Sequence, residues 1–367
     1  LPLVIGLASR VRRRQPVVSI IVCTGAVVLI VVLVGVVFVT TGVYTGVLTP
    51  ALGLFATFVA ITLIKFLQAE QEKGYIRNAF NHYLSAEVIN QIMDDPDMLA
   101  LGGQKKHLTA MFTDVKGFSS ISEVLDPSDL VMLLNKYLTN MSDVVLEENG
   151  TIDKFEGDAI ISFFGAPVEQ PDNAVRACRA ALEMKRREME LNPQFLEEKV
   201  APSPLLTRIG LNTGEMVVGN MGTKTRMDYT IMGHHVNLAA RLEGVNKQYG
   251  TWILASQATQ EAAGESFIWR KLDRVRVVGV TEPVRLFELV ARRDRAEKSV
   301  FQLIDGFHEA LDVFEQQDFS RANKLLTDLQ KDYPEDGPVQ AYAKRAEEFI
   351  KSPPPANWDG VFNLTKK

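Results

Sequence analysis

Three charged side chains near the middle of the sequence have the types and spacing that chemistry on a phosphate requires. Asp114 follows the apolar run LTAMFT, and Asp158 lies in the turn of DKFEGDAIISFFG, four residues after Lys154. A glycine lies close to each carboxylate, and backbone N–H groups at a strand-to-helix turn form an anion site beside which an aspartate can hold a metal ion. The pattern predicts a site for a nucleotide phosphate chain. Taken alone, neither aspartate is specific, because an aspartate at a strand end or in a Gly-Asp turn is most often a structural or solvated residue.

The elements around these residues predict how they meet. Leu108–Thr113 has the pattern of a short buried strand, and residues 128–147 carry apolar side chains at helical spacing. TIDKF and AIISFF predict a hairpin, followed by a helix from about Asn173 to Glu190. This order predicts an α+β sandwich of the ferredoxin-like kind. In that topology Asp114 and Asp158 share one sheet edge, where two carboxylates can hold a pair of divalent ions about 3.5–4 Å apart.

Residues 1–68 predict a membrane region. Gln15–Ile64 contains no charged residue, and as one helix it would be about 75 Å long, against a hydrocarbon core of about 30 Å. We therefore expect two transmembrane helices, at about 17–40 and 47–64. The cluster RVRRR before this run and the lysines after it predict that both ends face the cytoplasm, in a multi-pass protein of the cell (inner) membrane that contacts the lipid bilayer. The sequence begins with leucine, so we expect an upstream part, such as an extracytoplasmic sensor domain or a truncated helix.

Two further segments flank the central domain. Residues 69–106 are polar with apolar residues at helical spacing, which predicts a signal-transducing connector that pairs with a second copy, or else a spacer. Residues 292–367 are charged and helical, with the offsets of one tetratricopeptide repeat and a third helix at about 339–350. We expect this tail to pack on the domain before it or on a dimer mate. A partner-peptide site is the alternative, and PPPANW with the last residues is expected to be a loose end.

Four segments carry a resemblance to a known family: LTAMFTDVKGFSSISE, IDKFEGDAIISFFGAP, RIGLNTGEMVVGNMG and DYTIMGHHVNLAARLE. Their order and spacing resemble those of the class III adenylate cyclase catalytic domain, of the membrane-anchored bacterial type. The resemblance covers about Leu108–Leu289 and places the domain at residues 107–291. It implies a phosphorus-oxygen lyase that converts ATP to 3′,5′-cyclic AMP and pyrophosphate, with active sites at the interface of a homodimer formed through this domain and the connector.

The resemblance also implies which residues bind the metal ions and the phosphates. Asp114 and Asp158, with Val115, resemble the residues that bind two Mg²⁺ or Mn²⁺ ions in each active site. The loop that holds the pyrophosphate leaving group corresponds to Val115, Lys116, Gly117, Phe118 and Ser119.

A second group is implied to act on the base, the ribose and the transition state. Lys154 matches the residue that reads the adenine edge, and Thr230 its partner. Asn237 matches the asparagine that orients the ribose, and Arg241 the catalytic arginine that stabilises the pentacoordinate phosphate. In the family these residues and the metal-binding aspartates come from different chains. Lys154 and Asp158 would therefore serve opposite active sites of a homodimer, and a monomer would be inactive.

Two positions depart from the family pattern. A lysine that grips the phosphates in a stretch like VKGK is replaced by Val278 in VVGV. Arg276 and Arg274 lie on one face of the predicted strand, and we expect Arg276 to bind the substrate phosphates instead. The pair His234–His235 stands where polar residues such as Asp-Thr are frequent. Adjacent side chains on a turn diverge, so a solvated turn is favoured over a zinc site.

Several alternatives bound this interpretation. A catalytically weak nucleotide-sensing or scaffold member of the same fold is favoured by Val278 and the histidine pair, whereas both aspartates, Asn237 and Arg241 argue against it. Guanylate cyclase remains open, although guanylate cyclases usually carry an acidic residue in place of Lys154. EGDAI lacks the second glycine and the acidic-aromatic pair of the GGDEF signature, which argues against a diguanylate cyclase. The net charge of −5 gives no basic signal for nucleic acid, and two cysteines make no disulfide framework.

Overall fold

The structure, a computed structural model, describes residue 25 and residues 32–42, 52–53, 55–57, 59–60, 62–64, 102–223, 226–276, 282–355 and 357–363. The chain divides into two compact units, Leu1–Ala79 and Phe80–Lys367. Within the described residues, no helix combines the length and the apolar character that a membrane crossing needs. Only parts of the helices expected at 17–40 and 47–64 lie among the described residues, and most of the connector at 69–106 lies outside them.

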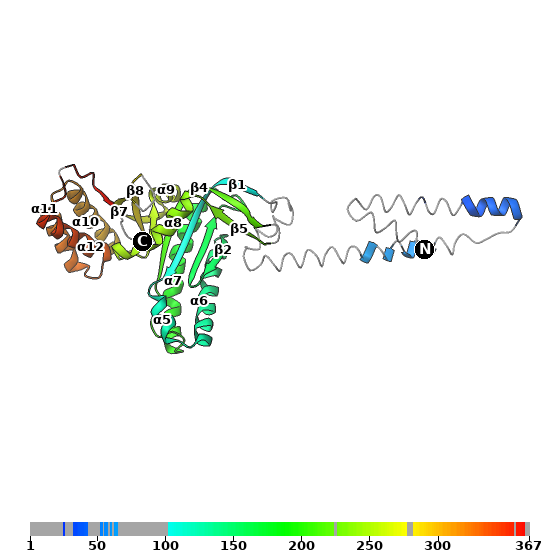
Figure 1. The fold of residues 1–367 in the computed structure, drawn as a ribbon, viewed down its shortest axis with the longest axis horizontal. Helices are drawn as coiled ribbons and strands as arrows, with labels where there is room; N and C mark the ends of the chain where they lie inside the picture. The colour runs from blue at the N-terminus through cyan, green and yellow to red at the C-terminus, as the bar shows by residue number, and fades with distance from the viewer. Residues whose placement is uncertain are drawn as a thin grey trace. The chain divides into compact units, whose positions relative to one another are not determined.

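The described strands of the second unit form one mixed sheet (Figure 1). Its order is β2-β3-β1-β4-β6-β8-β7-β9, with β5 paired to β4. Neighbours are antiparallel except β4 with β6 and β7 with β9. The strands are β1 Gly102–Val115, β2 Thr151–Glu156, β3 Ala159–Phe164, β4 Thr207–Thr223, β5 Arg226–Met232, β6 Ile253–Ser256, β7 Phe267–Arg276, β8 Val284–Arg292 and β9 Val361–Asn363.

The first strand is longer than the sequence predicts. β1 begins at Gly102 rather than Leu108 and pairs with β4 from Gly102 opposite Asn220 to Val115 opposite Thr207. Residues 102–106, which we expected in the connector, are therefore strand. These residues are mostly exposed, and their sequence does not alternate apolar with polar side chains. Backbone hydrogen bonds to β4 hold them in the sheet.

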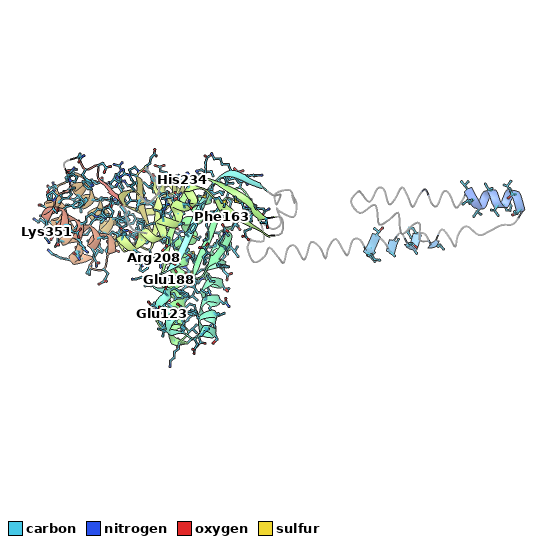
Figure 2. All side chains as sticks on the ribbon, viewed as in Figure 1. Glu123, Phe163, Glu188, Arg208, His234 and Lys351 are labelled. Carbon is cyan, nitrogen blue, oxygen red and sulfur yellow. The ribbon has the colours of Figure 1, made fainter. Side chains whose placement is uncertain are left out.

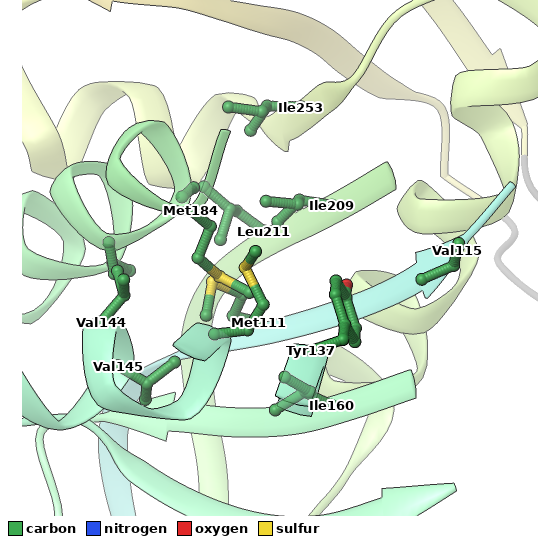
Figure 3. Packing of buried hydrophobic residues seen from close by; sticks show 14 of the residues in the cluster. Met111, Val115, Tyr137, Val144, Val145, Ile160, Met184, Ile209, Leu211 and Ile253 are labelled. Carbon is green, nitrogen blue, oxygen red and sulfur yellow. The ribbon is translucent and has the colours of Figure 1, made fainter. Parts of the chain in front are cut away.

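Helices cover both faces of the sheet. They are α5 Phe118–Val124, α6 Pro127–Glu147, α7 Asn173–Glu197, α8 His234–Tyr249 and α9 Gln257–Ala263, with the 3₁₀ helices η2 Gly264–Ser266 and η3 Arg293–Arg295. On β1, Met111 packs with residues of α6 and α7, whereas its neighbour Ala110 packs with residues of α8. Successive strand residues face opposite sides, so α6 and α7 lie on one face and α8 on the other. Figure 3 shows Met111 beside Met184 of α7. The class is α+β, as predicted.

The helix α8 approaches β4 very closely at Gly210. A Cβ atom there would lie 2.3 Å from the carbonyl oxygen of Ala239 and 2.3 Å from the nitrogen of Glu243. Only glycine fits this contact. The position of α8, and of every side chain it carries, is therefore fixed relative to the start of β4.

Three helices lie between β8 and β9 in the chain: α10 Lys298–Glu315, α11 Phe319–Asp332 and α12 Gly337–Lys351. They share one buried core with α8 and with β7 and β8, in which Tyr249 and Leu272 meet Phe307, Phe314 and Tyr342. The expected packing of the tail on the preceding domain is confirmed. The likeness to a tetratricopeptide repeat stays a prediction.

The prediction of a loose C-terminal end is wrong for residues 357–363. β9 pairs in parallel with β7, with Val361 opposite Arg274. The ring of Trp358 lies 5.4 Å from that of Phe349 and 6.3 Å from that of Phe314, between centroids. A three-residue strand is too short to show a periodic pattern, which is why the sequence did not predict it.

Candidate active site

The turn after β1 carries the first candidate group. Asp114 is half-buried near the strand's end, and Gly117 adopts a φ of 72° just before α5 begins at Phe118. The backbone N–H of Lys116 donates to the carbonyl of Leu206 (2.8 Å). A left-handed φ is costly for any residue with a Cβ atom, so Gly117 allows the strand to turn directly into the helix. The predicted strand-turn-helix is confirmed here.

The segment that holds this turn is itself anchored. The backbone N–H of Thr207 donates to Oε2 of Glu188 (2.6 Å), a buried residue that Figure 2 labels. Lys185 Nζ donates to the other oxygen of Glu188 (2.5 Å) and to the carbonyl of Thr207 (2.9 Å). The hydroxyls of Tyr137 and Thr207 lie 2.8 Å apart. The start of β4 is thus tied to α6 and α7, and it holds Lys116 in place.

The turn between β2 and β3 brings the second carboxylate to the first. The backbone N–H of Val115 donates to Oδ2 of Asp158 (2.9 Å), and Gly157 has a φ of 67°. Burial, and next the charge of Asp158, raise the pKa of Asp114. Two carboxylates in this arrangement repel each other, and a divalent cation between them would remove that repulsion.

The donor set therefore suits a hard cation. Among the described residues, no group of three or more His, Cys, Asp or Glu side chains is arranged to hold a metal. Two carboxylates with backbone, substrate phosphate and water oxygens would complete the shell that Mg²⁺ prefers. The roles of Asp114, Asp158 and Val115 as metal ligands stay predictions.

Lys154 and Thr230 meet through Asp153, a residue that we did not predict in the site. Asp153 Oδ2 accepts a hydrogen bond from Thr230 Oγ1 (2.5 Å), and Lys154 Nζ lies 3.5 Å from Asp153 Oδ1. These contacts connect β2 to β5, and they bring the two expected adenine-reading residues to one place. Asp153 stands next to Lys154 in the segment IDKF, but its hydrogen-bond partner Thr230 lies 77 positions further along the chain. The sequence therefore did not indicate their contact.

The helix α8 presents the last predicted pair. Asn237 is exposed and Arg241 is half-buried, one turn further along the helix. Across the described part of the chain, no hydrogen bond or ion pair joins either side chain to the two carboxylates or to the Lys154–Thr230 pair. A single chain thus brings together two carboxylates at one place and Lys154 with Thr230 at another.

Residues 103–290 match the model of the family described as "Adenylate and Guanylate cyclase catalytic domain". The chain belongs to this family. The resemblance inferred from the four sequence segments is therefore confirmed.

The matches between this cyclase domain and its relatives cover only part of each relative's chain. "Adenylate cyclase 1" of Rhizobium meliloti (strain 1021) is 35% identical over 212 residues, which is 58% of this chain and 31% of that protein. "Adenylate cyclase" of Anabaena cylindrica is 33% identical over 191 residues, 51% of this chain and 37% of that protein. A solved bacterial light-regulated adenylyl cyclase shares 25% identity with a TM-score of 0.52, over 67% of this chain and 69% of that one. The chain spans about a third of the length of these curated relatives.

The histidine pair of this cyclase domain has a structural role. The rings of His234 and His235 lie 4.3 Å apart, and Asn212 Nδ2 lies 3.3 Å from Nδ1 of His235 and donates to its carbonyl (2.8 Å). A Cβ atom at Gly214 would lie 2.5 Å from the His235 ring. The pair therefore opens α8, with His235 packed against β4, and does not form the expected solvated turn.

The expected substitute for the missing lysine has a partner in this chain. Arg276 ends β7 and lies 3.6 Å from Asp359, between Nη2 and Oδ2. Val278 lies outside the described residues. Both side chains of the Arg276–Asp359 pair are partly exposed, and the role of Arg276 in binding phosphate stays a prediction.

A third carboxylate near the pair was also missed. Burial, and next the charge of Asp114, raise the pKa of Glu243 to about 7, against the opposing charges of Lys247 and Arg208. Its position follows from two long-range facts: Gly210 lets the Glu243 backbone approach β4, and Arg208 of β4 stands opposite Asp114. No local pattern could have placed Glu243 beside the two aspartates.

We expect Glu243→Gln to raise thermal stability at pH 8 in EDTA, by about 2–4 °C. The pKa of Glu243 lies above its ordinary value in the fold, so the protonated fold is favoured at low pH and this contribution is lost as pH rises toward 7. The melting temperatures of wild type and variant should therefore converge near pH 5. Glu309→Gln, at an exposed position on α10, is the control. A difference independent of pH would contradict the assignment.

Proposed function

We propose that this protein is an adenylate cyclase, which converts ATP to 3′,5′-cyclic AMP and pyrophosphate as a homodimer. The observation that carries the proposal is the hydrogen bond from Val115 to Asp158, which joins the two turns and places both carboxylates together in a chain of the cyclase family. The bond formed is between the ribose 3′-oxygen and the α-phosphorus. The bond broken joins that phosphorus to the β-phosphate oxygen, and the 3′-hydroxyl proton is lost to solvent.

Different residues of this chain would have different roles in this displacement. Asp114, Asp158 and Val115 would hold two Mg²⁺ or Mn²⁺ ions, which when bound supply Lewis-acid activation of the attacking oxygen and charge neutralisation on the phosphates. In the turn from Val115 to Ser119, the backbone N–H groups of Gly117, Phe118 and Ser119 would face the leaving pyrophosphate. Those of Val115 and Lys116 already donate to Asp158 and to the Leu206 carbonyl. Arg241 adds a fixed positive charge to the pentacoordinate phosphorus, and Asn237 orients the ribose. These groups position the substrate and neutralise the charge on its phosphates, which is what phosphoryl transfer requires of a protein.

Dimerisation is supported by the surface around the base-reading pair. Phe155, next to Lys154 on β2, is 42% exposed, and Val217 of β4 and Met232 of β5, which pair with each other, are 39% and 57% exposed. Large exposed apolar side chains in such a group favour a covered surface. A second copy placed there would bring its own Asp114 and Asp158 toward this chain's Lys154, and would complete the active site.

Membrane anchoring is supported by the uncharged run from residue 15 to 64 and by the arginine cluster before it. The described residues of the first unit also expose large apolar side chains, including Val39 at 83% and Phe55 at 65%. We infer a multi-pass protein of the cell membrane with its catalytic domain in the cytoplasm. The protein should stay in the membrane fraction after a carbonate wash. Its release into the supernatant would contradict the inference.

The test of the proposed function is direct. The full chain in detergent is incubated with Mn²⁺ and either ATP or GTP, and the cyclic product is identified by mass spectrometry. We expect cyclic AMP from ATP at a rate well above that of cyclic GMP from GTP. A preference for cyclic GMP would identify a guanylate cyclase, and a protein that binds ATP without forming either product would be a non-catalytic member.

A further inference from the structure

Asp153 is a buried carboxylate to which the proposed reaction gives no role. Its side chain is 2% exposed, although its neighbours Lys154 and Phe155 reach the surface. It lies at an irregularity of β2, because Ile152 stands opposite Ser162 and Lys154 opposite Ile161, so that Asp153 has no partner in the pairing with β3. Such bulges redirect a side chain and recur beside active sites. Here the bulge accompanies a carboxylate that contacts β5 instead of solvent.

The two oxygens of this carboxylate have different surroundings. Oδ2 accepts hydrogen bonds from Thr230 Oγ1 (2.5 Å) and from the backbone N–H of Ile231 (3.4 Å). Oδ1 is buried and makes no hydrogen bond among the described residues, and it has only the Lys154 ammonium at 3.5 Å. Burial raises the pKa of Asp153, against the opposing effects of Thr230 and Lys154. Burying a carboxylate with so few partners is unfavourable, so a role beyond holding two strands together is indicated.

The hydrogen bond between Asp153 and Thr230 determines whether the Thr230 hydroxyl can donate a hydrogen bond to the base or accept one from it. A hydroxyl has one proton to donate and two lone pairs that accept. Thr230 donates that proton in a hydrogen bond to Asp153, because an ionised carboxylate is a stronger hydrogen-bond acceptor than a neutral base. Thr230 Oγ1 is left as an acceptor only. Adenine presents an amino group at position 6, which is a donor, whereas guanine presents an oxygen there, which is an acceptor.

Lys154 also favours adenine over guanine. Its ammonium group only donates; the neighbouring ring nitrogen of adenine, N1, accepts, whereas in guanine that nitrogen carries a hydrogen. The ammonium lies beside Asp153, so one carboxylate contacts both base-reading residues. We propose that Asp153 is a positioning residue that fixes Thr230 as a hydrogen-bond acceptor and so selects adenine over guanine. This inference rests on the proposed function, because it assumes that the Lys154–Thr230 pair contacts the base.

The test compares affinities and does not depend on turnover. The probes are 3′-deoxy-ATP and 3′-deoxy-GTP, which lack the attacking hydroxyl, and their dissociation constants for the full chain are measured by calorimetry with Mn²⁺. We expect Asp153→Ala to reduce the preference for the adenine nucleotide about tenfold, the effect of one charge-assisted hydrogen bond. Thr230→Val should reduce it similarly, and the double variant should add little, because both changes remove one interaction.

Two further variants separate selectivity from stability. Asp153→Asn keeps an acceptor for Thr230 and should hold the preference within about threefold of wild type. Asp273→Ala removes an equally buried, hydrogen-bonded carboxylate at the C-terminal helices; it should lower the melting temperature and leave the preference unchanged. If Asp153→Ala does not fold, Asp153→Val, an apolar strand former of similar size, replaces it.

The outcomes separate this inference from the proposed function. An unchanged preference in Asp153→Ala or its valine substitute, or a wild type without preference, would overturn the inference. A preference lost as fully in Asp153→Asn as in Asp153→Ala would overturn the role of the Thr230 proton. If the wild type makes no cyclic nucleotide but prefers 3′-deoxy-ATP, and Asp153→Ala removes that preference, the catalytic proposal fails and the role of Asp153 stands.

Discussion

Replacing Asp114 or Asp158 with alanine is expected to slow cyclic AMP formation by about 10²–10³ or more, the usual effect of losing one preorganised electrostatic group. Each change removes a carboxylate from the pair joined by the Val115–Asp158 hydrogen bond. Asp114→Ala should not lower the melting temperature, because burial and the charge of Asp158 already disfavour its ionised form. The rate is measured with saturating ATP and Mn²⁺, and Asp143→Ala, at an exposed position on α6, is the control.

A mixture of two inactive variants extends this test to the dimer. Asp158→Ala damages the carboxylate side of a site, and Arg241→Ala the opposite side. If the two sides come from different chains, half of randomly assembled dimers are mixed and each has one intact site, so about a quarter of the wild-type rate should return. Each variant carries its own affinity tag, so that mixed dimers can be purified and assayed. Should mixed dimers stay as inactive as either parent, the shared-site arrangement is wrong.

Replacing Arg345 with methionine is expected to lower the free energy of unfolding by about 3–5 kcal/mol, because it leaves a buried charge without its partner. Arg345 forms an ion pair with Asp273, which also accepts a hydrogen bond from the hydroxyl of Tyr249 (2.7 Å). The guanidinium lies 4.1 Å from the ring centre of Phe362 and 4.8 Å from that of Tyr342. Burial and the charge of Asp273 raise the pKa of Tyr249, so the tyrosine stays a neutral hydrogen-bond donor and leaves the charge of Asp273 without a counterion. Urea unfolding followed by tryptophan fluorescence measures the loss.

The double variant with Asp273→Asn isolates the cause. It removes the unpaired charge, so we expect it to be more stable than Arg345→Met alone. Arg321→Met, at an exposed position on α11, should change the free energy of unfolding by less than about 0.5 kcal/mol. An Arg345→Met protein that unfolds at the wild-type urea concentration would show that this ion pair does not hold the C-terminal helices.

Local sequence signals predicted the elements whose patterns lie within one segment. The helix expected at 128–147 is α6, because its apolar spacing and Pro127 start are continuous in the sequence. The strand, glycine turn and helix around Asp114 were predicted for the same reason. The meeting of Asp114 with Asp158 also followed, because a hairpin next to the first strand brings its turn to the same sheet edge.

Features that depend on contacts between distant segments could not be predicted. The role of Asp153 appears only when β5 brings Thr230 to β2, and that of Glu243 only when Gly210 admits α8. The first half of β1 lacks an apolar face, and β9 is shorter than any periodic signal. The roles assigned to Asn237, Arg241 and Arg276 come from family resemblance, and one chain cannot bring together groups that two chains would share.

The shared core of α8 with the C-terminal helices sets where a recombinant catalytic fragment can end. The family match stops at residue 290, and a gene shortened there would remove α10, α11, α12 and β9. The buried side chains of Leu242, Tyr249, Leu272 and Leu286 would then face water, on the helix that carries Arg241 and on the strands beside it. Such a fragment would be prone to aggregation. A soluble enzyme for crystallisation or screening should therefore extend through Asn363.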